Sequence, residues 1–130
     1  IKKLLSEIPT KNYREIPFEP QINVLYHLFD VFIHTPINNH FEAFGQTYIE
    51  ALASGIPSIF TLSGVAPEFI EHEKNALVVD YRNSEDLYQK MIQLIGNNAL
   101  QQTLIQNGKD SLQKFSLSLF IEKLETLYTK

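Results

Sequence analysis

The sequence predicts an α/β fold with a doubly wound parallel sheet that helices cover on both faces. Short apolar runs alternate with helix-like runs along the 130 residues, and this alternation is typical of parallel sheets. The runs VFI (31–33), SIF (58–60) and ALVV (76–79) are continuously apolar, as expected of strands buried on both faces. The length is that of a single domain.

The expected elements follow one another without a linker, a low-complexity tract or an internal repeat. In chain order they are a helix over 1–8, a strand over 13–18, a helix over 21–29, a strand over 30–35, a polar loop over 36–44, a helix over 45–54, a strand over 56–61, a helix over 67–72, a strand over 75–80 and helices over 86–97, 99–115 and 120–128. Two or three helices therefore trail at the C-terminus.

Glycines and capping residues set several of these boundaries. Gly55 fits the position just after a helix end, and Ser84 fits the N-cap of the helix that follows it. Gly108 predicts a break in a helical run, and Ser116 or Ser118 caps the last helix. We expect that last helix to pack back on the domain.

Composition excludes several classes of function. The net charge is −4 and the pI about 5.5, so the chain has no general attraction for nucleic acid or anionic membranes. There is no cysteine, and the histidines show no i, i+4 pair, so we expect no metal site. These are His27, His34, His40 and His72. No apolar run is long enough to span a bilayer.

Two loops that leave strand ends carry the candidate site, because ligands of open α/β sheets bind beyond the carboxyl ends of the strands. The longest, 35–44, delivers Glu42 and then Gly45 to the start of a helix. N–H groups at a helix N-terminus attract phosphate. Ser63 and Gly64 form a second turn before another expected helix start. His34, at a strand end, is expected in a packed or hydrogen-bonded role rather than a catalytic one.

The spacing of Glu42 and Glu50 indicates the kind of ligand. Eight residues of one helix span about 12 Å, whereas a hydrolase needs its carboxyl groups about 5–9.5 Å apart. The spacing suits an elongated ligand, such as a nucleotide sugar, with hydroxyl groups at both ends and a diphosphate between them. Two simpler interpretations stay open: Glu42 as a first-turn acid, and Glu50 as an exposed charge on a half-buried helix.

An ordered series of motifs carries a family resemblance over about residues 13–130. The series is DVFIHTP, then FEAFG with Glu42, then Glu50, ASGIPSIF, SGVAPEFI and NALVV. It resembles the C-terminal, donor-binding half of retaining glycosyltransferases of the GT-B fold (family GT4), with their E-x7-E motif at Glu42 and Glu50. The resemblance implies transfer of a sugar from a nucleotide-sugar donor to an acceptor, with retention.

The resemblance also implies a role for each site residue. Glu42 is the implied catalytic residue and contacts hydroxyls of the transferred sugar, and Glu50 holds the ribose. The other implied donor-binding residues are Phe44, Gly45, Gln46, Thr47, Ser63 and Gly64. Members of the family generally need no metal, so no cofactor is expected besides the donor substrate. Ala43 stands where the family usually has glycine, and a left-handed backbone there would cost alanine about 1 kcal/mol.

The implied Rossmann-like strand order is 3-2-1-4-5-6, and this chain has no counterpart to strands 1 and 2. The strand over 13–18 would then stand two strands away from the one over 30–35. We therefore expect residues 1–130 to be one N-terminally truncated donor-binding domain, poorly stable and inactive by itself. Its expected partner is an acceptor-binding N-terminal domain of the same polypeptide. The expected location is the cytoplasm, with a peripheral place at the inner membrane face as the alternative for the longer protein.

Two other functions remain as alternatives. The resemblance also implies basic phosphate-binding residues near the first strands of the domain, and this chain has no counterpart to them. A degenerate, non-catalytic binding module agrees with that lack and with Ala43. A dinucleotide-dependent oxidoreductase would need G-x-G-x-x-G after the first strand, and the chain has no such motif.

Overall fold

A computed structural model describes residues 2–129. Its sheet has three parallel strands, β1 (Phe32–His34), β2 (Ser58–Phe60) and β3 (Leu77–Val78), in the order β1-β2-β3. Ile33 pairs with Ile59, and Ile59 pairs with Leu77. The carboxyl ends of all three strands therefore meet at one edge of the sheet.

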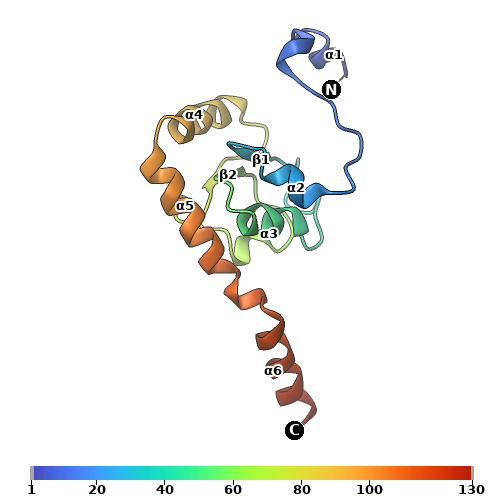
Figure 1. Cartoon of the computed structure of the whole chain (residues 1–130), viewed down its shortest axis with the longest axis vertical. Helices are drawn as coiled ribbons and strands as arrows, with labels where there is room; N and C mark the ends of the chain where they lie inside the picture. The colour runs from blue at the N-terminus through green and yellow to red at the C-terminus, as the bar shows by residue number, and fades with distance from the viewer. Residues whose placement is uncertain (1, 130) are drawn as a thin grey trace.

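Helices lie around this small sheet, whereas the first and the last helix lie away from it (Figure 1). They are α1 (Lys2–Leu5), α2 (Ile22–Tyr26), α3 (Gln46–Ala53), α4 (Ser84–Ile95), α5 (Asn98–Ser111) and α6 (Leu117–Tyr128), with 3-10 turns η1 (Thr10–Asn12), η2 (Ala66–Glu68) and η3 (Leu112–Phe115). Between residues 2 and 129, no helix combines the length and the apolar character that crossing a membrane requires.

Successive residues of β2 face two separate cores, which confirms the doubly wound α/β fold. Phe60 belongs to a cluster with Tyr48 and Leu52 of α3. Ile59 belongs to a second cluster with Leu94 of α4 and Leu104 of α5. Since neighbouring side chains of a strand point to opposite faces, α3 covers one face of the sheet and α4 and α5 cover the other.

The expected strand over 13–18 is not formed. The structure gives these residues no regular secondary structure, and β1 is the edge strand of the sheet. A strand needs a hydrogen-bonding neighbour, and this segment has none within the described residues, while Pro17 also removes a donor. The expected helix over 21–29 shortens to α2 and ends in turns.

Three expected details of the later elements also need correction. The cap of α4 is Asn83, whose side chain accepts from the N–H of Asp86, and not Ser84. The expected helix over 67–72 is only the single turn η2. Gly108 does not break α5, which runs to Ser111; a Cβ at Gly108 would lie 3.0 Å from Cδ2 of Leu52. Glycine therefore serves at position 108 to bring α5 close to α3.

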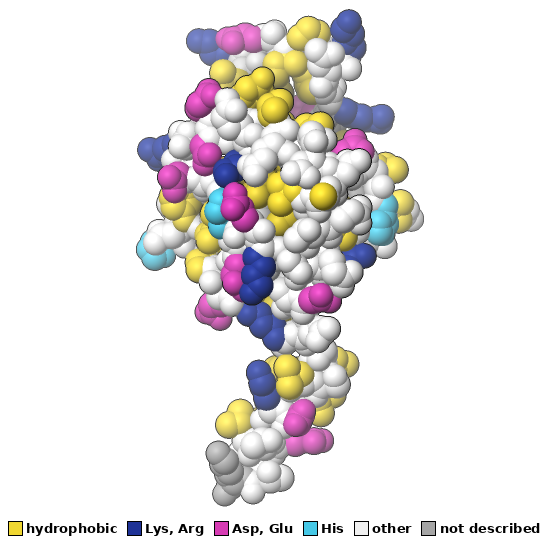
Figure 2. Space-filling model, turned by 90° about the vertical axis from the view of Figure 1, so that its left-hand side faces the viewer, with side chains coloured by type: hydrophobic (Ala, Val, Ile, Leu, Met, Phe, Trp, Pro, Cys, Tyr) yellow, Lys and Arg dark blue, Asp and Glu magenta, His cyan; other side chains and the backbone are white. Residues whose placement is uncertain are grey.

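The last helix does not pack back on the domain as expected. Ser116 does cap α6, but no residue of α6 is buried, and Phe120 and Leu127 are exposed. Figure 1 shows α6 leading away from the sheet, and in Figure 2 it stands out as a narrow extension of the body. Hydrophobic and charged side chains both lie along this extension (Figure 2).

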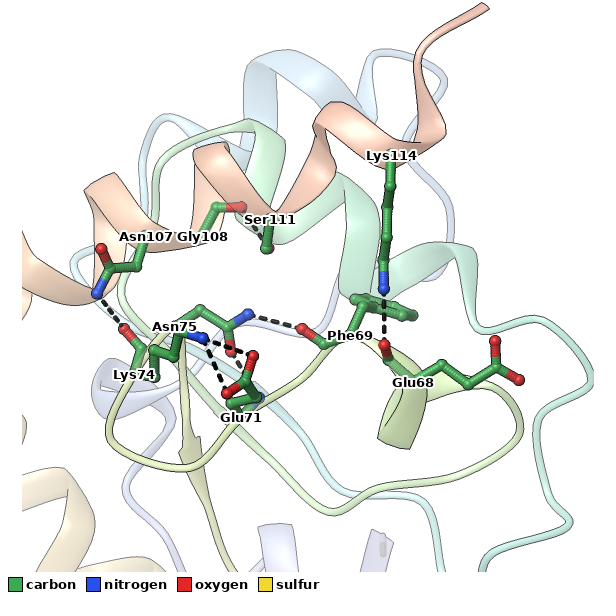
Figure 3. A network of polar contacts seen from close by, with 9 residues as sticks. All are labelled: Glu68, Phe69, Glu71, Lys74, Asn75, Asn107, Gly108, Ser111 and Lys114. Atoms are coloured by element: carbon green, nitrogen blue, oxygen red, sulfur yellow. Dashed lines mark hydrogen bonds and ion pairs between the residues drawn. The ribbon is translucent and has the colours of Figure 1, made fainter. Parts of the chain in front are cut away.

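A buried asparagine fixes the segment between η2 and β3 (Figure 3). The Asn75 side chain is 2% exposed; its Nδ2 donates to the carbonyl of Phe69 at 2.7 Å and its Oδ1 accepts from the N–H of Glu71 at 2.8 Å. Asn107 of α5 donates to the carbonyl of Lys74 at 2.8 Å from a more open position. The β2–β3 connection is thus tied to itself and to α5.

Replacing Asn75 by alanine is expected to lower the free energy of unfolding by about 2–4 kcal/mol, because two buried backbone groups lose their partners. Asn107→Ala, which removes one solvent-accessible bond of the same network, should cost about 1 kcal/mol or less. Urea denaturation of both variants measures the difference. Equal losses would contradict the structural role assigned to Asn75.

Candidate functional site

The loop after β1 is tied to the loop after β2. The N–H of Glu42 donates to Oγ of Ser63 at 2.9 Å, and the N–H of Gly64 donates to the carbonyl of Asn39 at 3.0 Å. Gly64 has φ +60°, and a Cβ there would lie 2.6 Å from the carbonyl oxygens of Glu42 and Ala43. The close approach and the left-handed backbone both require glycine at position 64.

A tyrosine positions the start of α3. Gly45 is buried, precedes the helix with φ +75° and leaves no room for a Cβ, which would lie 2.6 Å from the Tyr48 ring. Tyr48 is fully buried, and its hydroxyl donates to the carbonyl of Thr61 at 2.7 Å. The N-terminus of α3 is therefore fixed to the end of β2 through the Tyr48 side chain.

The N-terminus of α3 keeps free hydrogen-bond donors. No side chain caps it at Gly45. Across the described part of the chain, the backbone N–H groups of Gly45, Gln46 and Thr47 donate no hydrogen bond to protein. Three unused donors at the positive end of a helix form a favourable place for an anion such as phosphate.

Glu50, in the middle of α3, is half-buried and doubly hydrogen-bonded. It accepts from the Tyr26 hydroxyl at 3.2 Å and from Nε2 of Gln46 at 3.0 Å. Burial, with Glu50 beside it, raises the pKa of the Tyr26 hydroxyl to about 12, so that hydroxyl stays a donor. A carboxylate has about four acceptor positions, which leaves two for a ligand. Glu50 is thus more than an exposed surface charge.

The side chain of Glu42 lies in the loop before α3 and is 27% exposed. Its Oε1 is 3.2 Å from Nε2 of His34, at the end of β1. Because Glu42 precedes the helix, the two glutamates do not share one helix. Burial raises the pKa of the Tyr48 hydroxyl to about 12, and the carboxylate of Glu42 acts in the same direction.

The other residues that the sequence analysis singled out differ in exposure and in backbone conformation. Phe44 is half exposed and its ring contacts Phe115 edge-on. Thr47 is half-buried. Ala43 is not among the residues with positive φ, so alanine is accommodated there without the cost expected above.

Sequence reasoning missed Asn39, Tyr48 and Tyr26. Tyr26 is buried in the core, and its hydroxyl also orients Glu50. The signal for Tyr48 was its place three residues after Gly45, one turn along the same helix face. No sequence signal marked Asn39, because it acts through its backbone carbonyl.

A separate cavity of about 220 Å³ lies at the carboxyl ends of all three strands, on the α4 side. Thr35, Thr61, Asp80 and Arg82 are among its lining residues. None of the predicted donor-binding residues lines it. In residues 2–129, no group of three or more His, Asp or Glu is arranged to hold a metal ion.

The amino-acid sequence of this chain matches a known protein family over most of its length. Residues 2–111 match the family described as "Glycosyl transferases group 1". The chain belongs to this family.

This chain has curated relatives whose names are those of glycosyltransferases and of a synthase. It is 33% identical over 87 residues to an uncharacterised glycosyltransferase of Methanocaldococcus jannaschii, covering 67% of this chain and 25% of the relative. It is 29% identical over 108 residues to the alpha-monoglucosyldiacylglycerol synthase of Acholeplasma laidlawii, covering 83% of this chain and 26% of the relative. The chain thus spans about a quarter of the length of these curated relatives.

Solved structures share the fold, among them one of a group 1 family protein. The C-terminal domain of LpcC from Francisella tularensis aligns with TM-score 0.73 at 25% identity, over 89% of this chain and 62% of that one. HepE from Anabaena, solved in complex with UDP, aligns with TM-score 0.86 at 23% identity, over 99% of this chain and 36% of that one. The fold is therefore that of the C-terminal half of a GT-B enzyme.

Gly64→Ala is expected to destabilise the protein by about 3 kcal/mol, since a strained left-handed alanine would also press on two carbonyl oxygens. Gly55→Ala is the matched control, because Gly55 has φ +69° but a Cβ there would press only on the flexible end of Lys109, while Cγ2 of Ile105 would lie at an ordinary contact distance of 3.6 Å. It should cost about 1 kcal/mol. Chemical denaturation tests this order, and equal losses would show that the contact with residues 42–43 is unimportant.

Alkaline pH should weaken the fold through Tyr26 and Tyr48. Both folded-state pKa values are raised from 10.0 to about 12, so the stabilisation is complete below pH 10 and is lost as the pH rises toward 12. Each tyrosine accounts for roughly 2–3 kcal/mol of this loss. Urea unfolding across this pH range should show a smaller loss of unfolding free energy in Tyr48→Phe than in wild type. Tyr128→Phe, at an exposed site, should lose as much as wild type.

Proposed function

We propose that the chain forms the donor-binding part of a glycosyltransferase that transfers a sugar from a nucleoside diphosphate sugar to an acceptor with retention of configuration. Beyond family membership, this assigns the binding of the sugar donor to the start of α3 and the two glutamates. The observation that carries it is the set of unused N–H groups at Gly45, Gln46 and Thr47, with Glu42 before them and Glu50 after them.

The parts of the site match the parts of such a donor. The free amides at the start of α3 accept the diphosphate, because an anion there gains both hydrogen bonds and the helix dipole. Glu50, oriented by Tyr26 and Gln46, accepts hydrogen bonds from the ribose hydroxyls. Two acceptor positions match the two vicinal hydroxyls of ribose.

Glu42 contacts hydroxyls of the transferred sugar near the reacting carbon. The backbone of Phe44 and Gly45 and the turn at Ser63 and Gly64 complete this end of the site. When the bond to the leaving diphosphate breaks, negative charge grows on the phosphate oxygens. Backbone N–H groups that already point at that charge stabilise the transition state more than the ground state. In this proposal no metal ion is required.

The acceptor is proposed to bind outside residues 1–130, in an N-terminal domain of the same polypeptide. This agrees with the chain's span of about a quarter of its curated relatives and with the naming of the aligned LpcC structure as a C-terminal domain. The proposed location is the cytoplasm, where nucleotide sugars would reach the site. Structures of HepE with UDP and with UDP-glucose support a nucleotide-sugar donor.

Glu50→Ala in the complete polypeptide is expected to weaken binding of the preferred nucleoside diphosphate about 10- to 100-fold, the loss that corresponds to hydrogen bonds to a charged acceptor. Isothermal titration with UDP and GDP, each free and as its glucose or mannose conjugate, measures this. The 2′-deoxy form of the nucleotide should bind wild type more weakly than the ribose form, and Glu50→Ala should lose that preference.

Glu85→Ala is the matched control. Glu85 also accepts from a glutamine four residues away, Gln89, but it lies on α4, and its replacement should leave every affinity unchanged. Unaltered nucleotide affinity in Glu50→Ala would remove Glu50 from the ribose role. If no nucleotide binds the wild-type polypeptide, the non-catalytic binding module becomes the better interpretation.

A further inference from the structure

His34 presents a buried nitrogen toward Glu42. Nε2 of His34 is inaccessible to solvent and forms no hydrogen bond within residues 2–129, although Oε1 of Glu42 lies 3.2 Å away. The distance is that of a hydrogen bond, and only the alignment of the two groups falls short of one. Buried polar atoms are almost always hydrogen-bonded, so this pair is one small side-chain rotation from a bond.

One backbone hydrogen bond and one ring contact restrain His34 in this orientation. The residue ends β1, and its carbonyl accepts from the N–H of Thr61 at 3.2 Å, which fixes the backbone to β2. The ring meets the Tyr48 ring edge-on, with 4.9 Å between centroids. Tyr48 is fully buried and anchored by its hydroxyl to Thr61. The imidazole therefore has little freedom to turn away from Glu42.

The backbone of Glu42 is equally restrained, whereas its carboxylate is not. Ser63 holds its N–H, and Gly64 packs against its carbonyl oxygen. The carboxylate is partly exposed, and its only contact with a basic group or hydrogen-bond donor in the described structure is His34. The orientation of this carboxylate thus depends on the side chain at position 34.

We propose that His34 is a positioning residue that orients the Glu42 carboxylate toward the transferred sugar. When a nucleotide sugar enters the site, Nε2–H of His34 donates a hydrogen bond to Oε1 of Glu42. The second carboxylate oxygen of Glu42 is then left to accept a hydrogen bond from a sugar hydroxyl. His34 itself does not touch the substrate. This inference rests on the proposed function, since it assigns His34 to the sugar end of that site.

The inference predicts a selective defect. In the complete polypeptide, His34→Leu should weaken binding of the sugar-bearing donor about tenfold, as expected for loss of one hydrogen bond to a charged group. Binding of the corresponding nucleoside diphosphate without sugar should not change. The probes are UDP-glucose, UDP-N-acetylglucosamine and GDP-mannose, with UDP and GDP as their sugar-free forms. His34→Gln, whose Nε2 reaches a similar position, should restore most of the affinity.

A double-mutant cycle distinguishes positioning from a general structural role. In the Glu42→Ala background, His34→Leu should have no further effect on donor affinity, because the carboxylate it orients is absent. His27→Leu, at an exposed position, is the control and should match wild type.

Additive effects of His34→Leu and Glu42→Ala, or equal weakening of UDP and UDP-glucose, would overturn the positioning role. Failure of His34→Gln to recover affinity would do the same. If the wild type binds none of the probes, the proposed function fails first and the inference fails with it. Wild-type binding with an unaffected His34→Leu variant would instead reject the inference alone.

Discussion

The site depends on the contact between the two loops that leave β1 and β2. Their strands are paired, but each loop is long enough to move independently. Two hydrogen bonds, from Glu42 to Ser63 and from Gly64 to Asn39, and the close packing of Gly64 remove that freedom. Folding has therefore already removed the conformational entropy of these loops. A ligand then meets hydrogen-bond donors and acceptors that are in place before it binds, and it need not order them.

Tyr48 connects this contact to the core. Its ring lies between Gly45, His34 and Phe60, and its hydroxyl is bound to the end of β2. A single aromatic side chain thus sets where α3 begins, where its free N–H groups point and how much room His34 has. The proposed phosphate position and the proposed sugar position are both consequences of how one buried ring packs.

The electrostatics of the proposed site are local. The chain carries a net charge of −4, and Figure 2 shows acidic and basic side chains interspersed over one face rather than gathered in a field of one sign. In the proposed function, attraction for a diphosphate in this segment comes from backbone N–H groups and the dipole of α3. In the same proposal Glu50 can lie nearby because its ligands are neutral hydroxyl groups, and Tyr26 and Gln46 hold its carboxylate.

The sequence by itself determined the parallel α/β sheet, the helix after Gly45 and the family, because apolar periodicity, glycine and order along the chain are local signals. It failed where the outcome depended on a neighbour. Residues 13–18 form no strand because residues 2–129 offer them no strand to pair with, and Gly108 lies within α5, where Leu52 packs against it. Only the tertiary structure decided that Ser63 meets Glu42 and that Tyr26 meets Glu50, since residues more than twenty positions apart are brought together by packing, which no local pattern records.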